Sequence, residues 1–60
     1  EPVMLLHAAM RRLQSGQELT LRATDPSTER DVPNFCEFLG HALLVARREG
    51  DEFHYRIRKA

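Results

Sequence analysis

The first part of the chain carries apolar side chains at helical spacing. These apolar positions are Val3, Leu6, Met10 and Leu13. Residues three or four positions apart lie on one side of a helix, so the pattern indicates a helix with one buried face. Proline suits the first turn of a helix and glycine suits its end. The sequence therefore predicts a helix from Pro2 to about Ser15, with Gly16 as its stop.

The next segment alternates between polar and apolar side chains, which is the period of a strand with one buried face. Its apolar positions are Leu19, Leu21 and Ala23. We therefore expect a strand over Glu18–Thr24. Asp25-Pro26-Ser27 then supplies residues that favour a turn.

A second amphipathic helix is predicted after this turn. Its apolar face consists of Val32, Phe35, Cys36 and Leu39. The helix should end at Gly40, because glycine commonly follows the last turn. Proline is tolerated only near the start of a helix, so Pro33 requires this helix to begin near Asp31 or to have a loose first turn.

Two further strands complete the predicted elements. Ala42–Arg48 has strand character, and Phe53, Tyr55 and Ile57 alternate with polar residues in the last part of the chain. Because Gly50-Asp51 is a turn sequence, the two strands should form a hairpin.

The predicted order is helix, strand, helix, strand, strand, with no linker or repeat, which indicates one domain over residues 1–60. Two amphipathic helices need a sheet to cover, and three short strands offer little of one. A strand ahead of Pro2 would supply the rest, because strand, helix and parallel strand form a right-handed crossover unit. We therefore expect an α+β fold that is incomplete at its N-terminus. Since so small a domain has little stability to lose, we also expect weak or oligomeric folding of the sixty-residue chain.

Composition narrows the classes of function. Nine basic and nine acidic side chains balance, which removes the global field that nonspecific binding to nucleic acid or to a membrane surface needs. Cys36 is the single cysteine, and no signal peptide or long apolar run is present, so we expect a cytoplasmic protein without an internal disulfide. The His and Cys residues have no metal-ligand spacing, and no phosphate loop or nucleophile elbow is present, so no metal or cofactor is expected.

Several segments together resemble the TusA/SirA-type sulfur carriers, and the likeness continues to the basic end of the chain. The segments are Glu1-Pro2-Val3-Met4, Ala23-Thr24-Asp25-Pro26-Ser27-Thr28, Arg30-Asp31-Val32-Pro33 and Phe35-Cys36-Glu37-Phe38-Leu39. The resemblance implies a two-layer α/β sandwich of order βαβαββ, with two helices on a mixed sheet. The first strand of that order is missing here, which leaves αβαββ.

The resemblance also implies a function. The family's motif cysteine accepts persulfide sulfur from a cysteine desulfurase and passes it to a downstream acceptor protein, and the best-known destination is the 2-thiolated wobble uridine of tRNA. Glu1-Pro2 resembles the second half of the family's Cys-Pro-x-Pro motif, so the motif cysteine would directly precede Glu1. The resemblance therefore implies no catalytic residue within residues 1–60. The alternative is a noncatalytic protein-interaction module of the same fold that has lost the cysteine.

A helix that begins at Pro2 would suit such a cysteine, because the positive end of a helix lowers a thiol pKa. Most prolines at this position simply start a helix. Beside the apolar face, Met4, His7 and Arg11 form a stripe suited to docking on an apolar and acidic partner, unless this is only a solvated face.

The resemblance implies a set of partner-binding residues for the desulfurase and the next carrier. They are Glu1, Pro2, Met4, Arg11, Asp25, Arg30 and Phe38. We expect no direct contact with nucleic acid, no contact with a membrane, and a monomer when the protein is complete.

Other residues fit structural roles. Turn and helix-capping roles suit Asp25 and Asp31 better than acid/base catalysis. Phe35 should lie in the core, Phe38 on the surface, and Cys36 should be buried as a small hydrophobe. The cations of the last strand are Arg56, Arg58 and Lys59. They could contact RNA phosphates but more often protect the edge of a sheet.

Overall fold

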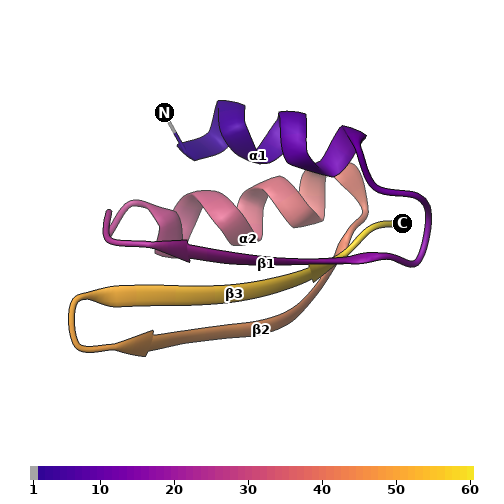
Figure 1. Ribbon diagram of the computed structural model, residues 1–60. Coiled ribbons are helices and arrows are strands. Elements are labelled where there is room, and N and C mark those ends of the chain that lie inside the picture. Colours follow the sequence, from indigo (N-terminus) through magenta and orange to yellow (C-terminus); the bar gives the residue numbers. More distant parts are fainter. Residues whose placement is uncertain (1) are drawn as a thin grey trace.

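The computed structural model describes the backbone of residues 2–60 and the side chains from Leu6 onward. The elements are α1 (Pro2–Arg11), β1 (Glu18–Ala23), α2 (Thr28–Leu39), β2 (Ala42–Glu49) and β3 (Glu52–Arg58). Figure 1 shows the two helices together on one side of the sheet, with both helices running in the same direction. The predicted α+β class and the predicted order of elements are confirmed.

The three strands form a sheet of order β1-β3-β2, with β3 in the centre. β3 pairs antiparallel with both neighbours, and Tyr55 lies opposite Leu21 on one side and Ala46 on the other. Among the described strands both pairings are antiparallel. The mixed sheet implied by the resemblance would need a further strand parallel to one of these.

The core lies between the helices and the inner face of β3. Its buried apolar residues are Leu6, Met10, Val32, Phe35, Cys36, Phe53, Tyr55 and Ile57. α1 contributes Leu6 and Met10 of its predicted face, whereas the side chain of Val3 lies outside the described residues and Leu13 follows the helix. α2 contributes its predicted face with one correction. Leu39 is 41% exposed, because it is the last residue of α2, where Gly40 (φ 77°) turns the chain away.

The end of α1 differs from the prediction. The helix stops at Arg11 instead of near Ser15, and the N–H of Leu13 then donates to the carbonyl of Met10 at 3.1 Å in a tighter turn. The N–H of Gly16, which has φ 89°, donates to the carbonyl of Lys59 at 2.8 Å. Gly16 is therefore tied to the C-terminal segment and does not stop the helix. β1 likewise ends one residue early, at Ala23.

The start of α2 also corrects the prediction. The helix begins at Thr28, and Pro33 lies inside it. Thr28 is buried, and its hydroxyl donates to the carbonyl of Asp25 at 2.8 Å. The Tyr55 hydroxyl lies 2.8 Å from the same oxygen, so it is the donor of that second bond. This anchor starts the helix earlier than Pro33 suggested, at the cost of the one backbone bond that proline cannot donate.

The predicted hairpin between the last two strands is confirmed. Glu49 lies opposite Glu52, and Gly50 has φ 59° while Asp51 has an ordinary negative φ. Glycine at the first central position is typical of a two-residue hairpin turn of type II′. A β-bulge between Leu43 and Val45 leaves the intervening residue without a partner on β3.

The buried hydroxyl pair should contribute measurably to stability. Tyr55→Phe removes one hydrogen bond, so we expect a loss of about 1 kcal/mol in the free energy of unfolding. Thr28→Val should cost about 1–3 kcal/mol, because it leaves the Tyr55 hydroxyl buried without an acceptor. Urea denaturation of both single variants and the double variant measures this. The double variant should lose less than the sum of the single losses, and additive losses would contradict the coupling.

Candidate functional site

The helix layer has one end where two helices begin. The described part of α1 begins at Pro2, and Figure 1 shows this end on the same side of the molecule as the start of α2. The positive ends of both helix dipoles are therefore on one side of the molecule. Glu1 lies outside the described residues, and so do the side chains of Pro2 and Met4.

Asp25 lies in the loop that leads into α2, at this same end. Its carboxylate accepts a hydrogen bond from the N–H of Ser27 at 2.9 Å. The pKa of Asp25 lies below its ordinary value, first because of this bond, then because of the Ser27 side chain, with a smaller contribution from Arg30. The predicted turn role of Asp25 is confirmed.

The predicted capping role of Asp31 is wrong. Because α2 begins at Thr28, Asp31 already lies within the helix. Its carboxylate instead accepts from the guanidinium of Arg30 at 3.0 Å. Arg30 is otherwise well exposed, so this predicted docking residue is on the surface.

The other end of the helix layer carries the aromatic residue predicted to be a docking anchor. Phe38 is 87% exposed, which confirms the predicted exposure. A hollow of about 570 Å³ lies beside it. The hollow is lined by His7, Asp31, Asn34, Phe35, Glu37 and Phe38. His7 of α1 meets the ring of Phe35 nearly at a right angle, with the ring centres 4.7 Å apart.

The described docking residues fall into two groups. Asp25 and Arg30 lie toward the starts of the helices, whereas Phe38 and Arg11 lie toward their ends. Since a helix rises 1.5 Å per residue, Arg30 and Phe38 are separated by about 12 Å along α2. A partner that contacts both groups would have to cover the length of the helix layer.

Sequence reasoning missed the polar residues of the hollow. Asp31, Asn34 and Phe38 are spaced by three and four residues, which places them on one side of a helix. This spacing could have revealed their shared side. It could not show that His7 of α1 completes the hollow, because that depends on how the two helices pack.

Cys36 is buried in the core, as predicted. The residue is 2% exposed, and desolvation raises the pKa of its thiol. Nucleophilic sulfur chemistry requires an accessible thiolate. Cys36 is therefore unsuited to receive or donate sulfur in the folded protein.

Two arginines of the last strand lie close to Glu18 on the outer face of the sheet. Glu18 lies 3.4 Å from Arg58 and 3.9 Å from Arg56. Within residues 2–60, no cluster of His, Cys, Asp and Glu has the arrangement of a metal site. No helix in this part of the chain is both long and apolar enough to span a bilayer.

Comparison with known proteins decides the family. The family model for sulfurtransferase TusA matches residues 1–59. This chain belongs to the TusA family. The sulfur carrier protein TusA of Pseudomonas putida strain W619 is 54% identical over 59 residues, which span 98% of this chain and 74% of that relative. The sulfur carrier protein TusA of Pseudomonas paraeruginosa is 52% identical over 59 residues, which span 98% of this chain and 75% of the relative.

Membership of the TusA family supports a role as a sulfur carrier. A carrier must meet at least one protein that donates sulfur and one that accepts it. The residues available for such contacts in the described part of the chain include the exposed Phe38, Arg11 and Arg30.

The lowered pKa of Asp25 predicts a pH-dependent contribution to stability. A carboxyl group whose pKa is depressed by folding stabilises the folded state above its unfolded pKa, near 4. This contribution is lost as the pH falls through the depressed value. Asp25→Asn should therefore be less stable than the parent protein at pH 7, and the two should converge below about pH 4. Urea midpoints measured across this range test the effect, and a constant difference would contradict it.

Proposed function

We propose that the complete protein relays persulfide sulfur from a cysteine desulfurase to a downstream acceptor protein, for the 2-thiolation of the wobble uridine of tRNA. The relay takes place in the cytoplasm. The acceptor is a protein, and this carrier has no direct contact with the tRNA. The family match over residues 1–59 supports the carrier role.

The transfer thiol in this proposal belongs to a motif cysteine directly ahead of Glu1. The observation that carries the proposal is the family match over residues 1–59. A thiol placed ahead of α1 would be favoured as a thiolate, because the positive end of a helix stabilises a thiolate placed beside it. The burial of Cys36 is consistent with a transfer thiol elsewhere in the complete protein.

Each transfer is an exchange of sulfur between thiols. The carrier thiolate attacks the outer sulfur of the desulfurase persulfide, and a new sulfur–sulfur bond forms on the carrier. The desulfurase cysteine leaves as a thiolate, so no external oxidant or reductant is needed. The cysteine of the acceptor protein then attacks the carrier persulfide in the same way, and the carrier thiolate is released.

The helix layer is the proposed docking surface. Phe38 and the adjacent hollow provide an exposed aromatic side chain next to a concave surface, and exposed aromatic residues are common anchors at interfaces. Arg11, exposed at the end of α1, adds a positive charge to the same end of the layer. A partner surface with an apolar pocket and acidic residues would match this end.

Sulfur loading tests the proposal directly. The complete protein, incubated with a cysteine desulfurase and cysteine, should gain the mass of one sulfur atom on the motif cysteine. The Cys36→Ala variant should gain the same mass, because buried Cys36 is not the acceptor. The sixty-residue chain alone should gain none. Mass spectrometry of the intact proteins and of their peptides measures these outcomes.

Two results of this experiment would contradict the proposal. A mass gain that disappears in Cys36→Ala would reject the motif cysteine as the transfer thiol and move the chemistry to the core cysteine. No gain in the parent protein would favour the noncatalytic interaction module.

Phe38 should contribute to docking without contributing to stability. Because its side chain is 87% exposed, Phe38→Ala should change the free energy of unfolding by less than about 0.5 kcal/mol. The variant should bind the desulfurase about tenfold more weakly, as expected for loss of an aromatic anchor. Phe38→Tyr is the matched control and should retain most of the affinity. Isothermal titration calorimetry measures all three, and equal affinities for the parent and Phe38→Ala would exclude this role.

A further inference from the structure

β2 forms one border of the sheet. It pairs with β3 on one side, and the described residues place no strand on its other side. From Val45 to Glu49 the register with β3 is regular, so this half of β2 presents an ordered row of backbone groups along the border. Natural edges are commonly protected by charged side chains, proline or bulges. β2 has no proline, but it carries a bulge near its start and the charged residues Arg47, Arg48 and Glu49 near its end.

The exposed side chains on this border include apolar ones. Leu44 at the bulge is 40% exposed, and Val45 beside it is 37% exposed. The bulge disturbs the first half of the strand and leaves the second half available. A regular, unpaired edge with adjacent apolar surface can pair with an added strand, and its charged residues restrict which strand fits.

A hollow of about 200 Å³ lies between α2 and this half of β2. Its apolar lining consists of Pro33, Ala46, Phe53 and Tyr55, and the charged residues Glu29, Arg47 and Arg48 also line it. Ala46 is exposed although it faces the helix layer, because its small side chain does not fill the space next to Pro33. The hollow has room for one further apolar side chain from a neighbouring strand.

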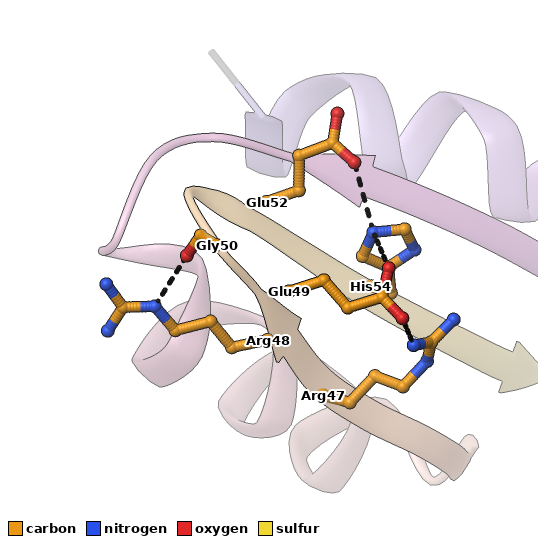
Figure 2. A network of polar contacts seen from close by, with 6 residues as sticks. All are labelled: Arg47, Arg48, Glu49, Gly50, Glu52 and His54. Carbon is orange, nitrogen blue, oxygen red and sulfur yellow. Dashed lines mark hydrogen bonds and ion pairs between the residues drawn. The ribbon is translucent and has the colours of Figure 1, made fainter.

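The same half of β2, from Val45 to Glu49, carries two arginines. Neighbouring residues of a strand point to opposite faces, so Arg47 lies on the outer face of the sheet and Arg48 on the face toward α2. Figure 2 shows Arg47 directed toward Glu49 and Arg48 directed toward the carbonyl of Gly50, which accepts its hydrogen bond at 2.9 Å. Arg47 remains about half exposed, so its guanidinium can also reach a carboxylate on an added strand.

We propose that the outer edge of β2 binds an extended segment of a partner protein as an additional strand. Residues directly opposite one another in a sheet point to the same face. The residue opposite Ala46 would therefore enter the hollow and should be apolar. The residue opposite Arg47 lies on the outer face and should be acidic. The partner is thus an extended segment in which an acidic side chain stands next to an apolar one.

This edge is separate from the docking surface proposed above. Figure 1 shows α1 and β2 on opposite sides of the molecule. A segment bound along β2 would leave the start of α1 free. The binding reaction involves no sulfur, so its test is independent of the carrier function.

Nuclear magnetic resonance titration of the isotope-labelled protein tests the proposal. The probe is the peptide Ac-Thr-Val-Glu-Val-Thr-NH₂ at millimolar concentration. Amide signals of Val45–Glu49 should shift, and alternate amides of this segment should exchange more slowly with solvent. The same peptide with both valine nitrogens methylated should bind at least about tenfold more weakly, because it cannot form the backbone ladder.

Charge-reversal variants test whether Arg47 selects an acidic side chain on the peptide. Arg47→Glu should weaken binding of the glutamate peptide about tenfold and should favour the peptide with lysine at the central position. Arg22→Glu is the matched control, because Arg22 and Arg47 lie opposite the same residue, His54, from the two sides of β3. Arg22→Glu should leave both affinities unchanged, and amide spectra of both variants verify their folding.

The proposal is overturned by any of three results. The first is the absence of any signal shift along β2 at the highest soluble concentration of the peptide. The second is a set of shifts confined to β1 or to the helix layer. The third is equal affinity for the methylated and unmethylated peptides. Equal effects of Arg47→Glu and Arg22→Glu would likewise reject recognition at this edge.

Discussion

Burial of the inner face of β3 is the interaction on which the rest of this structure depends. Phe53, Tyr55 and Ile57 are buried there against both helices, and each large apolar side chain contributes about 1.5–3 kcal/mol when removed from water. β3 also pairs with both other strands. Because this face is covered and the opposite one is not, β1 and β3 alternate between buried or half-buried and more exposed residues, and each helix needs only one apolar face.

The hydrogen bond between the hydroxyls of Thr28 and Tyr55 fixes the position of α2 on the sheet. Tyr55 belongs to the central strand, so its bond to Thr28 fixes the first turn of the helix against the sheet. The hydroxyl of Thr28 donates in turn to the carbonyl of Asp25, so the loop before α2 is also held in place. The anchor thereby also fixes where Arg30 and Phe38 lie over the sheet, while their separation follows from their spacing along α2.

Local periodicity was sufficient to predict the elements, the inner face of β3, and the burial of Cys36. The errors arose where a distant contact decides the local structure. Thr28 starts α2 early because its hydroxyl meets Tyr55, which is far away in sequence, and this early start also removes Asp31 from the capping position. The hollow beside Phe38 was not predictable either, because His7 reaches it only through helix packing.

The packing also bears on where sulfur chemistry can occur. A persulfide is attacked by any thiolate that can reach it, so a second accessible thiol would compete with the transfer cysteine of a carrier. Cys36 does not compete, because burial blocks access to its sulfur and raises the pKa of its thiol. The same core that positions α1 therefore favours an exchange confined to the proposed motif cysteine. A carrier of this size can then keep a cysteine in its core without diverting the sulfur.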